Sequence, residues 1–259
     1  MKTPVLSKIT LFPVKALSGV DVERAVVTPA GALRQDRQFA LQDEQGRLIN
    51  AKRHPEINQF DARFDLENRQ ITLDLYGFDE AETFDLYEGN EALETWFSDF
   101  FGFRVRLIEN ADQGFPDDRD RPGPTLISTA TLAEVHAWFP DLTFDEIRKR
   151  FRTNLEIADC PAFWEDRLNK VADDPIRFKI GDVLFEGLKH CVRCQVPTLD
   201  TRTGEAYPDF QKIFMQKREE TLPDWIEKSG FDHFYRLAIN TRIVWAPAEL
   251  QTGTPLLIL

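Results

Sequence analysis

The decisive stretch reads Lys189-His190-Cys191-Val192-Arg193-Cys194-Gln195-Val196-Pro197-Thr198-Leu199-Asp200. It contains two of the chain's three cysteines, three positions apart, and an arginine directly precedes the second one. A thiolate is a soft metal ligand and a strong nucleophile, and a neighbouring guanidinium favours the ionised form. Residues 180–188, directly upstream, alternate like a strand that follows a Gly-Asp turn. We therefore expect Cys194 to be the reactive residue of this stretch. It lies in a strand-like run that is followed by polar residues.

The C-x-x-C spacing alone leaves three other interpretations open. A zinc site needs two more ligands, and Cys160 and His190 are the nearby candidates. A thioredoxin-type dithiol normally opens a helix, whereas both cysteines here lie in a strand-like run. Two buried structural cysteines are the plainest alternative, since free cysteine is commonly buried. The adjacent Arg193 favours a reactive site over these readings.

Composition and charge limit the function classes. The chain has 259 residues, of which 42% are hydrophobic, so it can form one large domain or two modest ones. A net charge of −12 disfavours nucleic-acid binding, which needs a positive field. No stretch approaches the ~20 apolar residues of a membrane span, and the N-terminus lacks the long apolar region of a signal peptide. Three cysteines do not suit a disulfide framework, so we expect the reducing environment of the cytoplasm. We also expect a monomer without nucleic-acid or membrane partners.

The first part of the chain alternates apolar and polar residues between turn signals, which favours a barrel or sandwich. The predicted strands are 6–14, 22–28, 38–42, 57–66, 71–76 and 83–87. One predicted helix interrupts them, capped by Asn90 and ended by Gly102.

The second part alternates helix and strand after a polar segment, 111–124, that we interpret as a linker containing a solvated mixed-charge run at 117–121. Thr131 and Thr143 each start a pattern typical of a capping box, with glutamate three residues later. A looser helix is predicted over 209–226. The predicted strands are 153–157, 177–180, 183–188, a run around Cys194, 234–245 and 256–259. The fold class is therefore mainly β with α, an α+β protein.

Isolated basic residues lie at turns and strand ends in both parts of the chain. They are Lys15, Arg37, Lys52 and Arg152, with Asn154 close to the last. Each alone is most often a surface charge or a structural ion pair. These side chains form a binding site only if the fold brings them together. Their spacing in one sequence does not establish this.

Short motifs in this order resemble those of MOSC-domain proteins, a family named after the C-terminal domain of molybdenum cofactor sulfurase. The layout is similar to the two-domain branch that includes the amidoxime-reducing components, and it covers nearly the full length. The N-terminal motifs are Phe12-Pro13-Val14-Lys15 with Gly19, Asp36-Arg37-Gln38-Phe39, and Asn50-Ala51-Lys52 with Pro55. The C-terminal motifs are Arg150-Phe151-Arg152-Thr153-Asn154 and the run from Ile180-Gly181-Asp182 through the decisive stretch to Thr203-Gly204. The chain departs from the family's Ser, Arg, Pro and Thr at Ala16, Lys52, Thr153 and Pro197.

The resemblance implies a fold and a cofactor. The expected fold is an N-terminal β-barrel-like domain over residues 1–115 and a C-terminal MOSC β-barrel with helices over 116–259. The implied cofactor is molybdenum–molybdopterin, with Cys194 as the thiolate ligand of the metal. By this resemblance, the expected cofactor-binding residues are Lys15, Arg37, Lys52, Arg152, Asn154 and Arg193. Cations in this set fit an anionic cofactor, since guanidinium groups bind phosphate well even in an acidic protein.

The expected function is an oxidoreductase that reduces N-hydroxylated or N-oxide small molecules. Its electrons are expected from a separate electron-transfer protein, because the cysteines are too few for an iron–sulfur cluster. Asp200 either relays protons in catalysis or has a structural role in a turn. A sulfur carrier with a persulfide on Cys194, or a protein that handles molybdenum cofactor, is the alternative. A third reading is a binding module without turnover.

Overall fold

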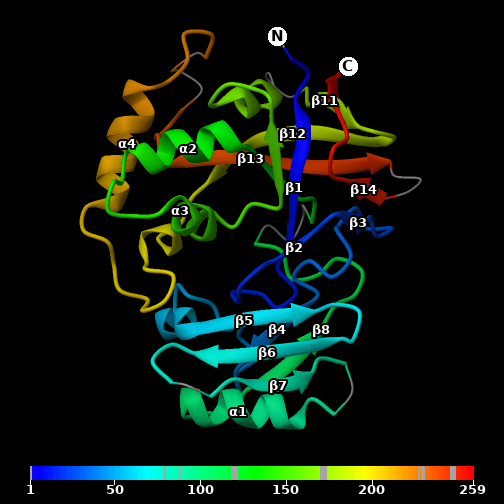
Figure 1. The fold of residues 1–259 in the computed structure, drawn as a ribbon, viewed down its shortest axis with the longest axis vertical. Coiled ribbons are helices and arrows are strands. Elements are labelled where there is room, and N and C mark those ends of the chain that lie inside the picture. Colours follow the sequence, from blue (N-terminus) through cyan, green and yellow to red (C-terminus); the bar gives the residue numbers. More distant parts are fainter. Residues whose placement is uncertain are drawn as a thin grey trace.

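The computed structural model describes residues 2–78, 80–87, 89–117, 122–169, 174–226, 228, 231–245 and 249–259. Figure 1 shows two lobes stacked along the long axis, with both termini at the end of the upper lobe. The upper lobe holds the largest sheet and most of the helices, and the lower lobe holds two small sheets and one helix. The predicted α+β class is confirmed.

The upper lobe is built on an eight-stranded sheet in the order β15-β11-β12-β13-β9-β10-β1-β2. Its strands are β1 (Val5–Leu11), β2 (Val20–Val22), β9 (Thr125–Ser128), β10 (Leu155–Ala158), β11 (Ile176–Ile180), β12 (Val183–Val192), β13 (Arg236–Trp245) and β15 (Leu256–Ile258). All neighbours pair antiparallel except β9 and β10.

The sheet closes on itself where β1 meets the residues before β15. Val5 forms an antiparallel bridge with Pro255. The Leu6 amide also donates to the Thr254 carbonyl at 2.9 Å, and the Leu256 amide donates to the Pro4 carbonyl at 2.8 Å. These bonds satisfy backbone groups that an open edge would expose, so the strands form a barrel around an apolar core.

Helices pack on the outside of this barrel and enclose a second, aromatic core. They are α2 (Thr129–Ala137), α3 (Phe144–Phe151), α4 (Phe210–Glu220) and the 3-10 turns η2 (Trp164–Leu168) and η3 (Val196–Thr198). The predicted capping box of Thr143 is confirmed at the start of α3. The one predicted at Thr131 is wrong, because Ser128 caps α2 and Thr131 lies inside the helix, where its own amide donates to the Ser128 hydroxyl.

The lower lobe surrounds its own core, which includes the aromatic residues of α1. One sheet pairs β4 (Phe39–Gln42) with β8 (Arg106–Glu109), and the other orders β5 (Phe60–Asp65), β6 (Gln70–Leu75) and β7 (Glu82–Asp85). The turn η1 (Pro55–Gln59) precedes β5, and α1 (Glu91–Phe101) closes the lobe. Gly102 ends α1 in the left-handed conformation as predicted, whereas Asn90 occupies the N-cap position without a side-chain hydrogen bond.

The start of the chain contributes to the upper lobe. Strands β1 and β2 belong to the barrel sheet, and β3 (Arg24–Val26) pairs with β14 (Glu249–Gln251) near the C-terminus. Strands from the two expected domains, 1–115 and 116–259, therefore pair with each other. The division of the chain into these two domains remains a prediction. Within the expected mixed-charge run, residues 118–121 lie outside the described part of the chain.

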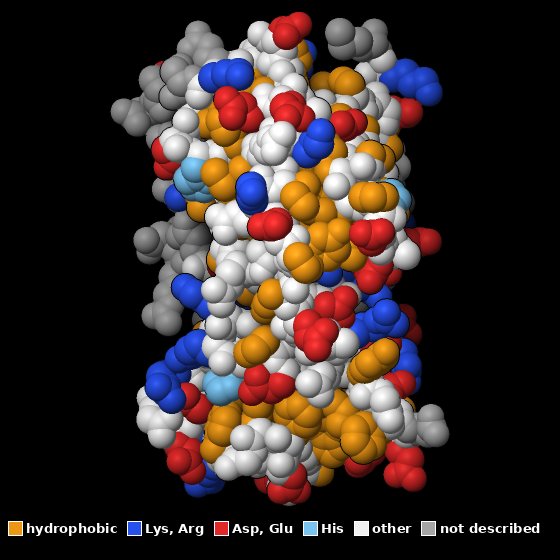
Figure 2. Space-filling view, turned by 90° about the vertical axis from the view of Figure 1, so that its left-hand side faces the viewer, with side chains coloured by type: hydrophobic (Ala, Val, Ile, Leu, Met, Phe, Trp, Pro, Cys, Tyr) orange, Lys and Arg blue, Asp and Glu red, His pale blue; other side chains and the backbone are white. Residues whose placement is uncertain are grey.

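The surface mixes charges of both signs, and hydrophobic side chains gather on the lower lobe on the face shown in Figure 2. Across the described ranges, no helix combines the length and apolar character needed to span a bilayer.

Candidate functional site

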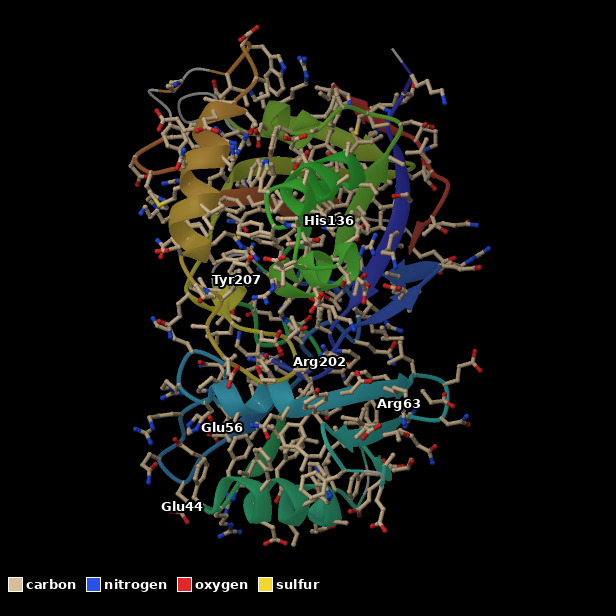
Figure 3. All side chains as sticks on the ribbon, turned by 60° about the vertical axis from the view of Figure 1, so that its left-hand side comes forward. Glu44, Glu56, Arg63, His136, Arg202 and Tyr207 are labelled. Carbon is tan, nitrogen blue, oxygen red and sulfur yellow. The ribbon has the colours of Figure 1, made fainter. Side chains whose placement is uncertain are left out.

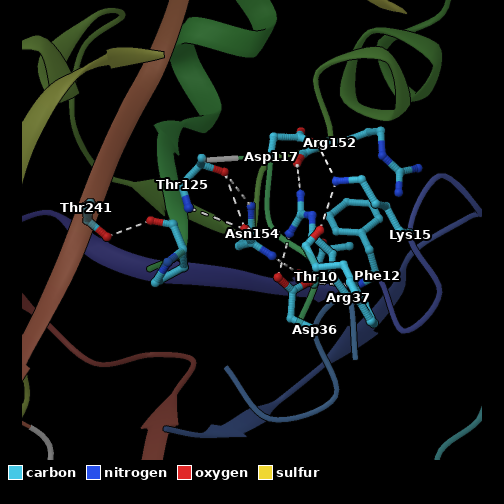
Figure 4. Close-up of polar contacts among 12 residues, drawn as sticks. Thr10, Phe12, Lys15, Asp36, Arg37, Asp117, Thr125, Arg152, Asn154 and Thr241 are labelled. Atoms are coloured by element: carbon cyan, nitrogen blue, oxygen red, sulfur yellow. Dashed lines mark hydrogen bonds and ion pairs between the residues drawn. The ribbon is translucent and has the colours of Figure 1, made fainter. Parts of the chain in front are cut away.

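The candidate site begins with an aromatic ring at the end of β1. Phe12 is buried, and the guanidinium carbons of Arg37 and Arg152 lie 5.0 and 4.2 Å from its ring centroid. Figure 4 shows both arginines gathered around this ring. Gly19 makes room for it, because a Cβ there would lie 2.7 Å from the Phe12 ring. Phe12 is thus a platform on which two cations, remote in sequence, come together.

Arg37 has a fixed counterion. Its Nη1 lies 2.5 Å from Asp36 Oδ2, and it also donates to Asn154 Oδ1 at 3.3 Å. Burial acts to lower the pKa of Arg37, but attraction to Asp36 and Asp117 outweighs it and raises the pKa above its ordinary value. Arg37 adopts a left-handed backbone with φ of 50°, a conformation that is uncommon for non-glycine residues and clusters at functional sites.

Lys15 is buried and reaches the segment that joins the lobes. Its Nζ donates to the Phe115 carbonyl at 2.8 Å and to Asp117 Oδ1 at 2.5 Å. Burial lowers the pKa of Lys15 from its ordinary value, with Arg37 and Arg152 acting in the same direction. Asp117 has an 89% exposed side chain, and the nearby Lys15 and Arg37 charges lower its pKa to about 2.

Arg152 is the cation of this cluster for which no described residue provides a paired carboxylate. It caps α3 in a left-handed conformation with φ of 48°, and its contact with Phe12 is a ring contact. Among the described residues, none donates to, accepts from or forms an ion pair with its guanidinium. Burial, reinforced by the nearby charge of Arg37, lowers the pKa of Arg152 to about 9. A half-buried cation held in this way is suited to an external anion.

Asn154 is used structurally, since its side chain joins three segments. Nδ2 donates to the Thr10 carbonyl at 3.1 Å, and Oδ1 accepts from the Thr125 amide at 3.3 Å and from Arg37. It therefore positions Arg37.

The cysteine stretch leaves the barrel beside this cluster. Strand β12 ends at Val192, so Cys191 lies in the strand and Cys194 lies beyond it; the expected strand around Cys194 is wrong. Arg193 donates to Cys191 Sγ at 3.0 Å and to the carbonyl of Phe151, the residue before Arg152. Cys194 is exposed, and its Sγ accepts from the Val196 amide at 3.4 Å.

The two further ligands that a zinc site would need lie elsewhere. His190 is buried, with Nε2 3.0 Å from Asp166 Oδ1. Cys160 packs against the barrel core, and burial raises the pKa of its thiol to about 12. The described residues contain no cluster of three or more His, Cys, Asp or Glu side chains arranged to hold a metal ion.

A buried arginine, Arg150, for which the sequence predicts no site role, holds the segment after Cys194. It donates to the carbonyls of Pro197 at 3.0 Å and Leu199 at 2.5 Å, and lies 3.7 Å from Asp200. Asp200 itself accepts from the amides of Arg202 and Thr203, both at 2.9 Å. Its contacts are those of a turn-forming aspartate.

This turn docks on the lower lobe. Gln195 Nε2 donates to the Lys52 carbonyl at 3.1 Å, so Lys52 meets the cysteine stretch through its backbone while its side chain is exposed. Arg202 lies between the lobes in Figure 3, with its guanidinium 5.4 Å from the Tyr76 ring centroid. Gly204 approaches Pro55 so closely that a Cβ would lie 2.4 Å from the Pro55 carbonyl oxygen.

We expect Gly204→Ala to destabilise the protein by about 2–3 kcal/mol, because a methyl group there meets backbone in addition to the strain of its φ of 76°. Urea unfolding measures this change. Gly253→Ala is the matched control: φ is 83° and nothing lies within 4 Å, so about 1 kcal/mol of backbone strain is expected. Equal losses in the two variants would show that Gly204 does not hold a tight contact between the lobes.

One open surface depression lies apart from the cation cluster. It has a volume of about 510 Å³ and is lined by the start of α4 and by Thr198 and Tyr207. None of the expected site residues lines it.

Comparison with known proteins gives two family matches in chain order. The MOSC N-terminal beta barrel domain matches residues 3–84, and the MOSC domain matches residues 125–253. Among solved structures, a YUAD protein from Bacillus subtilis aligns over 99% of this chain and 96% of its own, with 11% identity and a TM-score of 0.43.

Curated relatives carry the name molybdenum cofactor sulfurase. The Homo sapiens protein is 22% identical over 257 residues, covering 81% of this chain and 28% of the relative. The Caenorhabditis elegans protein is 20% identical over 256 residues, covering 89% and 34% respectively. The chain thus spans about a third or less of the relatives' length. Because the two family matches together cover most of its residues, the chain belongs to the MOSC domain family, in the arrangement that pairs a MOSC N-terminal beta barrel domain with a MOSC domain.

Proposed function

We propose that this protein binds a molybdenum–pterin cofactor between its lobes and acts as a reductase of N-hydroxylated or N-oxide small molecules. The observation that carries the proposal is the cluster of Lys15, Arg37 and Arg152, in which Arg152 has no counterion among the described residues. The cofactor is an anion with a terminal phosphate, and such a cluster provides the charge-assisted hydrogen bonds that phosphate prefers.

The residues present fit the group. Lys15, Arg37 and Arg152 would hold the phosphate end, and Arg193, placed by Cys191 and Phe151, would face the dithiolene part. The exposed Cys194 thiolate would be the protein ligand of the metal, because a soft thiolate suits a soft, redox-active metal. When bound, the cofactor would supply two-electron chemistry that removes oxygen from the substrate.

The chain's own contribution is orientation. Arg150 and the turn at Asp200 fix the segment that follows Cys194, and Gln195 ties it to the lower lobe. Burial would raise the pKa of Asp200, but hydrogen bonds from the Thr203 and Arg202 amides outweigh it and lower the pKa below its ordinary value. An ionised, fully engaged carboxylate is a poor proton donor near neutral pH, so we assign Asp200 a positioning role.

A sulfur carrier or molybdenum-cofactor-handling protein is the second candidate. The name of the curated relatives favours it, as does the exposure of Cys194, which leaves the sulfur open to a partner. The two functions predict different groups bound to the purified protein. Protein from a host that makes the cofactor should contain molybdenum and fluorescent pterin under the first proposal, and an additional sulfur on Cys194 under the second.

We expect the molybdenum-loaded protein to reduce a model amidoxime with reduced viologen and to be inactive with NADH alone. The reason is that these 259 residues contain three cysteines and no dinucleotide fingerprint, so they offer no iron–sulfur or NADH site, and we propose a separate protein as the electron donor. Turnover is measured by chromatography of the amidine product, before and after adding a reductase and a small carrier. Loaded protein that stays inert with viologen across several N-hydroxylated substrates would reject the reductase proposal and leave the carrier.

A further inference from the structure

The two carboxylates in the cation cluster are held in different ways. Asp36 is fixed: its side chain is 9% exposed, and it accepts from the Phe12 amide at 2.9 Å as well as pairing with Arg37. Asp117 is 89% exposed, and its hydrogen-bond partner among the described residues is Lys15. The Arg37 counterion is therefore part of the framework, whereas the Lys15 counterion is attached at one point.

Each of the two carboxylates pairs with one cation of the cluster. Asp36 neutralises Arg37 and Asp117 neutralises Lys15, so that within the described part of the chain Arg152 is the cation of this cluster without a paired carboxylate. If the Asp117 carboxylate leaves, Lys15 and Arg152 together present two positive charges, which match a phosphate dianion. Lys15 keeps its hydrogen bond to the Phe115 carbonyl in either case, so its ammonium group stays in place.

We propose that Asp117 is a built-in competitor: its carboxylate occupies the phosphate position beside Lys15 in the empty protein, and a phosphate-bearing ligand binds by displacing it. This inference rests on the proposed anion site and concerns how that site is regulated. Because the neighbouring cations lower the pKa of Asp117 to about 2, its carboxylate is ionised at any working pH and always competes. Asp117 then excludes weakly charged ligands and favours a dianion, which gains two cations in exchange for one displaced carboxylate.

The test measures binding of inorganic phosphate to cofactor-free protein produced in a host without pterin synthesis. Thermal unfolding is followed at pH 7.5 and constant ionic strength while phosphate is titrated, and the dissociation constant is obtained from the shift in midpoint. The variants are Asp117→Asn, which keeps size but removes the charge, and Arg152→Gln, which removes the free cation. Asp112→Asn is the matched control, because it removes the same charge from an exposed position in the same segment.

We expect Asp117→Asn to bind phosphate about three- to tenfold more tightly than the unsubstituted protein, since one competing ion pair is removed. Asp112→Asn should bind within about twofold of the unsubstituted protein, as expected for a screened, distant charge. Arg152→Gln should lose phosphate binding.

The outcomes separate the inference from the function on which it rests. If Arg152→Gln loses binding while Asp117→Asn binds no more tightly than Asp112→Asn, the anion site stands and the competitor role of Asp117 is rejected. If Arg152→Gln binds phosphate as tightly as the unsubstituted protein, the anion site itself is wrong. Absence of phosphate binding in every variant, Asp117→Asn included, rejects both.

Discussion

Replacement of Cys194 by alanine is expected to abolish reductase activity and retention of molybdenum while leaving the fold intact. The thiol is exposed and lies past the end of β12, where its hydrogen bond is one long contact from the Val196 amide. Removing such a side chain should change the free energy of unfolding by no more than about 0.5 kcal/mol. The metal, by contrast, would lose its protein ligand. Metal analysis, amidoxime turnover and urea unfolding on one preparation measure all three properties.

Cys191→Ser is the matched control, because it removes the other sulfur of the same motif. Cys191 accepts a hydrogen bond from Arg193 at 3.0 Å, and a serine hydroxyl can accept the same bond at some loss in fit. We therefore expect substantial activity and nearly full molybdenum content in this variant. An essential Cys191 with a dispensable Cys194, under reducing conditions, would show that the ligand assignment is wrong.

Local patterns predicted the secondary structure well where one rule decides it. The capping box at Thr143 and the glycine that ends α1 depend on neighbouring residues alone, and both were predicted from sequence. The predictions failed where two local signals competed. Ser128 and Thr131 both suit a helix start, and the strand hydrogen bonds of β9 decide for Ser128. Cys194 continues an alternating pattern, but Pro197 and the contacts of Arg150 turn the chain away after Val192.

The candidate site was harder to predict, because it is made by long-range pairing. Motif order indicated Lys15, Arg37 and Arg152. The structure places both arginines at the Phe12 ring, and Lys15 close enough for their charges to lower its pKa. The carboxylate partner of Lys15 is 102 residues away, in a segment whose sequence reads as a solvated charge run. Nothing in the spacing of a polar segment tells which of its acids pairs with Lys15. Lys52 and Asn154 illustrate the converse, since each lies near the site but contributes through its backbone or through structural hydrogen bonds.

Arg152→Gln is expected to reduce cofactor occupancy strongly while leaving the cofactor-free protein as stable as before, or more stable by up to about 1 kcal/mol. Loss of a charge-assisted contact should cost about 1.5–3 kcal/mol of binding. The free energy of unfolding should instead stay the same or rise in this variant. Arg152 is repelled by the nearby charge of Arg37 and has no paired carboxylate among the described residues. Arg193→Ala should lower occupancy in the same way, since Arg193 is the next cation along the proposed site. Pterin fluorescence and urea unfolding measure the two quantities separately.

The sign of the stability effect follows from proton linkage. Folding lowers the pKa of Arg152 to about 9, so the unfolded chain binds this proton more tightly than the folded chain does. The resulting penalty on the folded state is fully present below pH 9, and it is relieved as the pH rises above that value. Glutamine removes the penalty at pH 7 while keeping part of the contact with Phe12. If Arg152→Gln instead lowered the free energy of unfolding by more than about 1 kcal/mol, as loss of a structural contact does, Arg152 would be a structural residue. A protein that holds a repelled cation in a left-handed conformation gives up stability for it, and recovers that stability when an anion binds.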